Sequence, residues 1–141
     1  MKILIFGHGY SAGFLTPLLV QRGWQVTGTT RNDAARVAAA GAQPLIWPGQ
    51  DDAVRAAIAD ADAILICAAP DPATGDPVLS AFRDHLARAT PRWLGYLSTT
   101  GVYGDRGGDW VDEDSPLDGI GPRAQARIQA EGDWQALSAQ A

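Results

Sequence analysis

The chain has 141 residues, of which 46% are hydrophobic and 19% charged, so we expect one packed globular domain. Its net charge of −5 argues against a nucleic-acid-binding surface, which needs clustered Lys and Arg. The single cysteine, Cys67, allows no intrachain disulfide and no zinc site built on cysteine pairs, which fits a reducing compartment.

The N-terminal apolar run has only four residues before Gly7, fewer than the ~7–15 of a signal peptide core, and no stretch approaches the ~20 residues of a membrane span. The two histidines lie far apart in the sequence and have no carboxylate at metal-ligand spacing. We therefore expect a cytoplasmic protein with no membrane or nucleic-acid partner and no metal site. The oligomeric state stays open.

Short apolar runs alternate with helix-like segments along the first 98 residues. The runs are too short for helices and are bounded by Gly, Pro or Asp, which is typical of buried strands. The predicted strands cover residues 3–6, 25–29, 44–47, 63–67 and 93–98, and the predicted helices cover 11–22, 33–40, 51–60 and 77–89. This alternation favours right-handed βαβ crossovers. We predict an α/β fold of the Rossmann type, a three-layer α/β/α arrangement around a doubly wound parallel sheet in the order 3-2-1-4-5.

The composition changes after the fifth predicted strand. Residues 99–121 are rich in Gly, Asp and Pro, which predicts a long loop, and loops of this length are usually functional or mobile. A terminal helix is expected over 122–140, with Pro122 at its first position. We interpret 1–141 as one nucleotide-binding domain.

A glycine-rich turn follows the first predicted strand. Gly7, His8, Gly9, Tyr10, Ser11 and Ala12 together match the pattern G-x-G-x-x-A. Spaced glycines let the chain reverse tightly and approach a pyrophosphate, and the helix that follows presents free N–H groups to that charge. The position between a strand and a helix is the context that this motif requires. The turn therefore predicts a bound dinucleotide through residues 7–11, although a strand-to-helix turn that binds nothing has the same pattern.

The end of the second predicted strand indicates which dinucleotide is preferred. NAD-binding units usually place an acidic residue there for the ribose 2′-hydroxyl, whereas an Arg accommodates the 2′-phosphate of NADP. This chain has Thr30 and Arg31 at that point and no acid before Asp33. We therefore expect NADP in preference to NAD, while a solvated Arg31 at a helix start is the alternative.

Two further segments fall near the expected ligand. Ala68, Ala69 and Pro70 follow the fourth predicted strand at the carboxyl edge of the sheet, where small residues would let the cofactor pass. A tight βα turn would explain them equally well. Trp47 ends the third predicted strand, so it either packs in the core or stacks on the adenine. Cys67 lies on a buried strand and is interpreted as a core residue rather than a nucleophile.

The segment around the fifth strand carries a resemblance to a known family. It reads Tyr-Leu-Ser-Thr-Thr-Gly-Val-Tyr-Gly-Asp over 96–105 and Trp-Val-Asp-Glu-Asp-Ser-Pro over 110–116. Together with the glycine turn, it resembles the NAD(P)-dependent epimerase/dehydratase family of extended short-chain dehydrogenases/reductases, in a bacterial branch related to nucleotide-sugar epimerases. The resemblance extends from Met1 to about Trp134. It implies a nicotinamide dinucleotide cofactor, a small-molecule substrate and oxidoreductase or epimerase ancestry.

The resemblance also implies one catalytic residue, and at a second position this sequence departs from the family's catalytic motif. A Ser or Thr three residues before the Val of Val-Tyr-Gly helps to polarise the substrate in this superfamily, and Thr99 has that position. The alternative is that Thr99 simply caps the strand end. The family's Tyr-x-x-x-Lys pair falls on Arg123 and Arg127, and arginine cannot replace a tyrosine in proton transfer.

Three hypotheses of function follow from these observations. The first is an NAD(P)-binding protein related to nucleotide-sugar epimerases with an altered catalytic helix. The second is a non-catalytic dinucleotide-binding sensor or partner-binding module. The third is an inactive fragment of a longer enzyme, because family members continue for more than a hundred further residues that supply the substrate lobe, and we expect that lobe to be absent from these residues.

Overall fold

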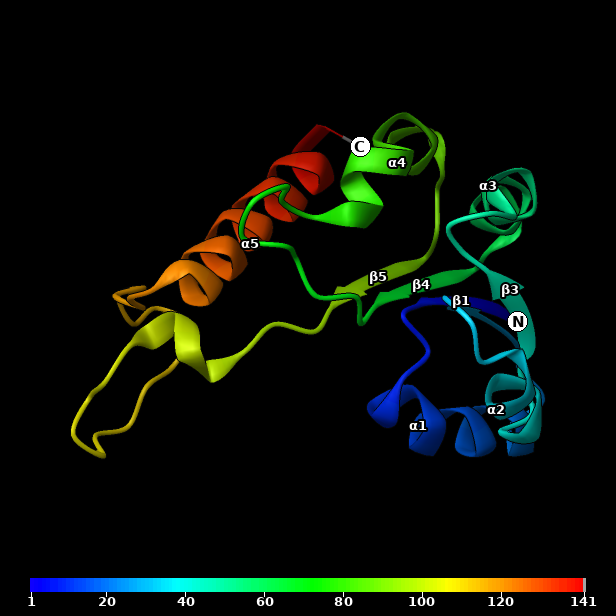
Figure 1. Cartoon of the computed structure of the whole chain (residues 1–141), viewed down its shortest axis with the longest axis horizontal. Helices are drawn as coiled ribbons and strands as arrows, with labels where there is room; N and C mark the ends of the chain where they lie inside the picture. The colour runs from blue at the N-terminus through cyan, green and yellow to red at the C-terminus, as the bar shows by residue number, and fades with distance from the viewer. Residues whose placement is uncertain (141) are drawn as a thin grey trace.

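The computed structural model describes residues 1–140 as a parallel sheet covered by helices on both faces (Figure 1). The strands are β1 (Lys2–Phe6), β2 (Gln25–Thr30), β3 (Gln43–Ile46), β4 (Ala63–Ile66) and β5 (Trp93–Tyr96). The helices are α1 (Tyr10–Gln21), α2 (Ala34–Ala39), α3 (Asp51–Asp60), α4 (Pro77–Arg88) and α5 (Pro122–Gln140), with a short 3₁₀ helix η1 (Thr100–Tyr103).

The strand order is β3-β2-β1-β4-β5, and every pairing is parallel. The predicted fold class and strand order are therefore confirmed. Because the order reverses between β1 and β4, the turns that follow these two strands diverge at the carboxyl edge. In open α/β sheets this divergence is where ligands bind.

The side-chain alternation of the strands divides the core into two layers. Ile3 and Ile5 of β1 face α1 and α2, where Val26 and Val37 join them. Leu4 of β1 faces the opposite side. That larger core is built from β1, β3 and β4 with α3, α4 and α5, through Leu4, Phe6, Leu45, Val54, Ile58, Ile64, Ile66, Val78, Leu79, Phe82, Leu86, Trp134 and Leu137. Burial of both faces explains why the central strands are almost wholly apolar.

The structure corrects three details of the predicted elements. Helix α1 begins at Tyr10 rather than residue 11. Strand β5 ends at Tyr96, two residues earlier than predicted. The Leu97 N–H still donates to the Ile66 carbonyl, but Ile66 is the last residue of β4, so the pairing of the two strands ends there. The segment 99–121 is not wholly a loop, because Thr99 Oγ1 accepts from the Gly101 N–H at 3.2 Å and starts η1.

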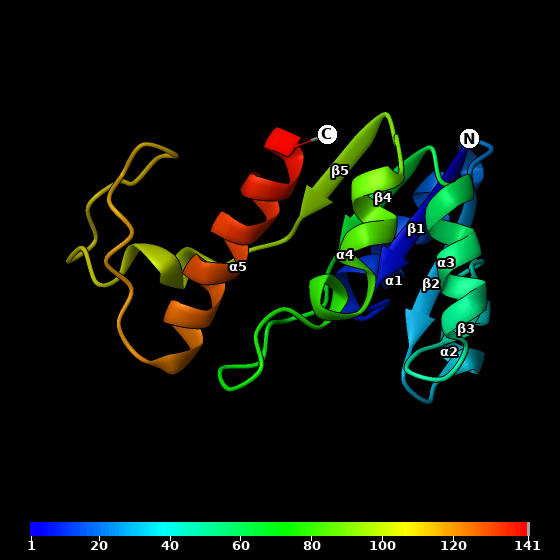
Figure 2. The ribbon, with the colours of Figure 1, turned by 90° about the horizontal axis from the view of Figure 1, so that it is seen from above.

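The segment after η1 projects from the body of the molecule before the chain returns into α5 (Figure 2). Its base is fastened by Arg106, which donates to the carbonyls of Tyr103 at 3.0 Å and Pro116 at 2.7 Å and pairs with Asp118 at 2.9 Å. Helix α5 packs beside α4, where Trp134 and Leu137 join the same buried core as Leu79, Phe82 and Leu86. Within residues 1–140, none of the helices combines the length and the hydropathy that a membrane crossing requires.

Candidate functional site

The turn between β1 and α1 depends on glycine at position 7. Gly7 has a φ of +76°, and a Cβ there would lie 2.9 Å from the amide nitrogen of Ala68, at the end of β4. A side chain at this position would therefore be strained and would push the ends of β1 and β4 apart. The Gly7 N–H donates to Thr29 Oγ1 at 2.9 Å, which ties the turn to β2.

Gly9 is the N-cap residue of α1 and leaves the N-terminus of the helix open. No side chain caps α1, and its first turn carries no acidic residue. By contrast, the side chains of Asp33 and Asp76 cap α2 and α4. A Cβ at Gly9 would meet only the Gly7 carbonyl oxygen, at 3.8 Å, so the space beside the turn is open. Free N–H groups at a helix start with such access form an anion-binding position.

A cavity of about 650 Å³ adjoins this turn at the carboxyl edge of the sheet. It brings together five of the predicted cofactor residues, namely Gly7, Thr30, Arg31, Ala68 and Ala69. Its other lining residues are Thr29, Trp47, Pro48, Thr74, Pro77, Ser80 and Ala81. The ends of four strands, β1 to β4, thus converge on one space beside an uncapped helix.

Arg31 lies exposed on one wall of this cavity, directly after β2. Trp47 forms another wall and also packs in the core, since its ring centroid lies 5.9 Å from that of Phe6 and 5.3 Å from that of Phe82. The two interpretations of Trp47 are therefore compatible: the indole is held by aromatic packing and still borders the cavity.

His8 is placed differently from the other residues of the turn. Its side chain is buried, and Nε2 is hydrogen-bonded to Thr16 Oγ1 at 2.7 Å. Its N–H donates to the Thr29 carbonyl at 2.8 Å. His8 therefore has partners within the fold for its amide and for Nε2, and its expected contact with the ligand stays a prediction.

The remaining predicted residues lie around the cavity rather than in its lining. Tyr10 and Ser11 are exposed in the first turn of α1, and Pro70 is half-buried after β4. Thr99 is exposed beyond the end of β5, where its hydroxyl oxygen already accepts from the Gly101 N–H. The structure thus joins the glycine turn, β2 and β4 in one site and places Thr99 at the next strand end.

The side chain of Arg127 on α5 binds the end of β5. Its Nη1 donates to the Leu97 carbonyl at 2.7 Å and to the Tyr96 hydroxyl at 3.1 Å, and the guanidinium lies 5.6 Å from the centre of the Tyr96 ring. Burial raises the pKa of the Tyr96 phenol, and the charge of Arg127 offsets only part of that increase. Tyr96 is therefore not an activated acid or base.

Sequence reasoning missed Thr29 of β2 and the part of the site that comes from α4. Thr29 holds the glycine turn, and Pro77, Ser80 and Ala81 form a wall of the cavity. The alternation of β2 could have indicated Thr29. No sequence signal shows which turn of α4 faces the ligand, since that depends on how the helix packs.

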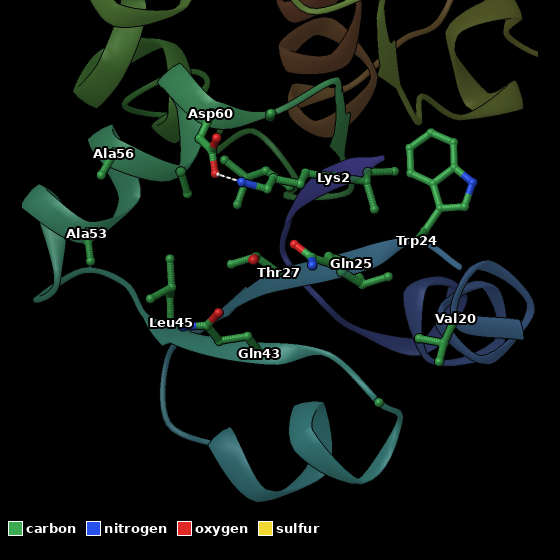
Figure 3. Close-up of a pocket in the computed structure, with 16 residues that line it drawn as sticks. Lys2, Val20, Trp24, Gln25, Thr27, Gln43, Leu45, Ala53, Ala56 and Asp60 are labelled. Atoms are coloured by element: carbon green, nitrogen blue, oxygen red, sulfur yellow. Dashed lines mark hydrogen bonds and ion pairs between the residues drawn. The ribbon is translucent and has the colours of Figure 1, made fainter. Parts of the chain in front are cut away.

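A second cavity, of about 860 Å³, lies at the opposite edge of the sheet (Figure 3). It is bordered by the first residues of three strands, Lys2, Gln25 and Gln43, and by the alanines of α3. Lys2 Nζ pairs with Asp60 across its rim at 2.6 Å. Although it is larger, it lies at the amino edge, away from the strand ends where open α/β sheets hold their ligands.

Cys67 follows β4 and is half-buried. Burial raises the pKa of its thiol to about 11, so it is protonated at neutral pH. Among residues 1–140, no three His, Cys, Asp or Glu side chains are grouped so that they could hold a metal ion.

Comparisons with known proteins identify a fold rather than an activity. No protein-family model matches the chain, and no curated protein matches it. Among solved structures, a functionally unknown conserved protein from Silicibacter pomeroyi DSS shares 45% identity with a TM-score of 0.86. The match covers 96% of this chain and 49% of that one.

Two UDP-sugar epimerases share the fold at lower identity. The UDP-glucuronic acid 4-epimerase from Bacillus cereus, solved in complex with NAD, is 16% identical with a TM-score of 0.81, over 97% of this chain and 52% of that one. The UDP-glucose 4-epimerase from Thermotoga maritima, solved with UDP-glucose, is 15% identical with a TM-score of 0.80, over 98% and 51%. The predicted resemblance is thus confirmed in the fold, and this chain spans about half the length of the structures it matches.

Proposed function

We propose that this chain binds a nicotinamide dinucleotide at the carboxyl edge of its sheet, with NADP preferred to NAD. The observation that carries the proposal is the cavity of about 650 Å³ beside the uncapped start of α1. The residues fit the cofactor. Only glycine suits the tight turn at position 7, and the open side of Gly9 leaves room for a pyrophosphate. Solved structures of the same fold that contain NAD support this assignment.

The preference for NADP rests on Arg31. This arginine lies exposed at the cavity, and no acidic side chain among residues 1–140 borders that cavity. A guanidinium can pair with a 2′-phosphate through charge-assisted hydrogen bonds, whereas a ribose 2′-hydroxyl offers it no charge to neutralise. Thr30, which precedes Arg31, and the wall formed by Trp47 would hold the adenosine half.

The chemistry at the other end of the cofactor is less complete. A bound nicotinamide supplies a hydride donor or acceptor, and Thr99 at the end of β5 would donate a hydrogen bond to a substrate oxygen. The residues at the family's Tyr-x-x-x-Lys positions, Arg123 and Arg127, cannot move the accompanying proton. We therefore assign the described chain dinucleotide binding, with relatedness to nucleotide-sugar epimerases and without their proton-transfer pair.

The second candidate function is a non-catalytic dinucleotide sensor or partner-binding module. The observation that favours it is the engagement of Arg127 with Leu97 and Tyr96, which turns the catalytic position of the helix into a structural attachment. A longer protein in which this chain is one part is the remaining alternative. A cytoplasmic location and the absence of nucleic-acid and membrane partners remain predictions from composition.

The test is calorimetric titration of the purified chain with NADPH and NADH at pH 8. We expect saturable binding at one site per chain, with NADPH binding more tightly. Quenching of tryptophan fluorescence that disappears in Trp47→Phe would place the ligand at the cavity. The proposal would be refuted if neither NADPH nor NADH binds.

A further inference from the structure

His8 occupies an unusual place for a titratable side chain, inside the turn proposed to bind the pyrophosphate. Only 2% of its surface is exposed. Its ring lies directly over Gly28 of β2, where a Cβ would come within 2.6 Å of His8 Cδ2. The ring therefore fills the space between β2 and the glycine turn, and Gly28 is the residue that leaves room for it.

Two hydrogen bonds fix this arrangement. The ring is bonded through Nε2 to Thr16 of α1 at 2.7 Å, and the His8 N–H donates to the Thr29 carbonyl at 2.8 Å. The neighbouring Gly7 N–H donates to Thr29 Oγ1. His8 thus joins β2, the turn and α1, the three segments whose relative positions set the shape of the proposed phosphate site.

The other ring nitrogen has no hydrogen-bond partner among residues 1–140, although it is buried. A neutral ring with its proton on Nε2 leaves only an acceptor lone pair at Nδ1. A protonated ring would place both a second N–H donor and a positive charge there, which is costly in a buried site. Burial accordingly lowers the pKa of His8, and its interaction with its own main chain offsets this only in part.

No acidic side chain on the surrounding elements would stabilise the charged ring. β2 has no titratable residue, β1 has only Lys2 at its far end, and Tyr10 of α1 is exposed. Directly after β4 the titratable side chain is the thiol of Cys67, which is protonated and uncharged at neutral pH. On α2 the charge of Arg36 lowers the pKa of His8 further, and the Asp33 carboxylate is paired with Arg36.

We propose that His8 is a positioning residue of the dinucleotide site, which holds the glycine turn in its binding shape only while its ring is neutral. Protonation would expel the ring from over Gly28 and release Thr16, so the turn would lose its shape and the dinucleotide would dissociate as the pH falls. The inference rests on the proposed function, because it concerns how the same site is held.

The test is NADP⁺ affinity between pH 8 and pH 5 for the wild type, His8→Gln and His85→Gln. Glutamine can replace Nε2 in the hydrogen bond with Thr16 but does not titrate. His85 on α4 is the matched control, because it is the second histidine of the chain. Titration of the ligand's own 2′-phosphate is common to all three proteins. We expect the Kd of the wild type and His85→Gln to rise relative to His8→Gln, approaching about tenfold per pH unit below the pKa of His8.

A second measurement does not depend on the variant folding. NMR titration of the His8 ring in the wild type should give a lower pKa with NADP⁺ than without it, because coupling between two binding events is reciprocal. Equal pH slopes in wild type and His8→Gln, or a His8 pKa raised by the ligand, would overturn the inference while leaving the proposed function intact. Absence of binding at any pH would overturn both.

Discussion

The indole N–H of Trp134 donates a 2.8 Å hydrogen bond to Oδ2 of Asp76, 58 positions away in the sequence, and both residues are buried. The other carboxylate oxygen, Oδ1, accepts from the N–H groups of Val78 and Leu79 and so caps α4. One carboxylate thus fixes the start of α4, which borders the cavity at the carboxyl edge of the sheet, and also attaches α5 to α4.

Replacing Asp76 should therefore cost more stability than losing a cap alone. We expect Asp76→Ala to lower the free energy of unfolding by about 2–4 kcal/mol, because about 1 kcal/mol comes from the cap and the rest from the unsatisfied indole N–H. Urea unfolding followed by circular dichroism measures the change. The matched control is Asp33→Ala, which removes the exposed cap of α2 and should cost about 1 kcal/mol. Equal losses in the two variants would show that the bond to Trp134 contributes nothing.

Three glycines of the first turn and helix should respond differently to alanine. Gly7→Ala should unfold or strongly destabilise the chain, because its φ is +76° and the Ala68 backbone lies 2.9 Å from the new Cβ. Gly13→Ala, in the interior of α1 with nothing within 4 Å, should stabilise by about 0.5–1 kcal/mol.

Gly9→Ala separates binding from folding. A Cβ at this position would meet no close neighbour, so we expect the variant to fold. The methyl group would instead occupy the open side of the turn, and we expect a loss of dinucleotide affinity of at least tenfold by calorimetry. Unchanged affinity in a folded Gly9→Ala protein would mean that no pyrophosphate approaches this turn.

The cofactor preference depends on a single exposed arginine. We expect Arg31→Ala to weaken NADPH binding by about tenfold, near the ~1.5 kcal/mol lower limit of a charge-assisted contact, while NADH affinity stays the same. Arg22→Ala, an exposed arginine at the far end of α1, is the matched control and should alter neither affinity. The assignment to NADP is wrong if the ratio of the two affinities is the same in Arg31→Ala and the wild type.

The strand order could be predicted from the sequence, because short apolar runs separated by helices leave few possible topologies. The glycine turn was recognisable because local geometry requires Gly7 and because Gly9 follows it at the spacing of the motif. The orientation of His8 was not predictable, since the motif accepts any residue there. What draws the ring inward is the room above Gly28, which is 20 positions further along the chain and is brought near only by the pairing of β1 with β2. The wall formed by Ser80 depends in the same way on the packing of α4.

The thiol of Cys67 should react slowly with disulfide reagents. Its pKa of about 11, raised from 9.0 by burial, leaves about 100-fold less thiolate at pH 8 than an unperturbed thiol would have. We expect labelling by a chromogenic disulfide to be slower by about that factor than labelling of the urea-unfolded chain, and to accelerate with rising pH up to about 11. Labelling as fast as in the unfolded chain would contradict the raised pKa.

The final prediction is that the described chain binds dinucleotide without appreciable epimerase or dehydrogenase turnover on nucleotide sugars. Hydride transfer at a sugar carbon requires proton transfer at the substrate oxygen, and general acid–base help is typically worth about 10²–10⁴ in rate. Arg127 is occupied by Leu97 and Tyr96, and Thr99 is too weak an acid or base to supply that help.

Two measurements test this prediction. Absorbance at 340 nm follows NADPH during incubation of the chain with oxidised UDP-sugars, and chromatography detects epimerised UDP-sugars. Calorimetry on the same preparation confirms that the cofactor site is competent. The matched control is Thr99→Val, which should leave the background rate unchanged if no catalysis takes place. Sustained, sugar-dependent oxidation of NADPH that Thr99→Val abolishes would instead show that the end of β5 carries catalysis without the tyrosine–lysine pair.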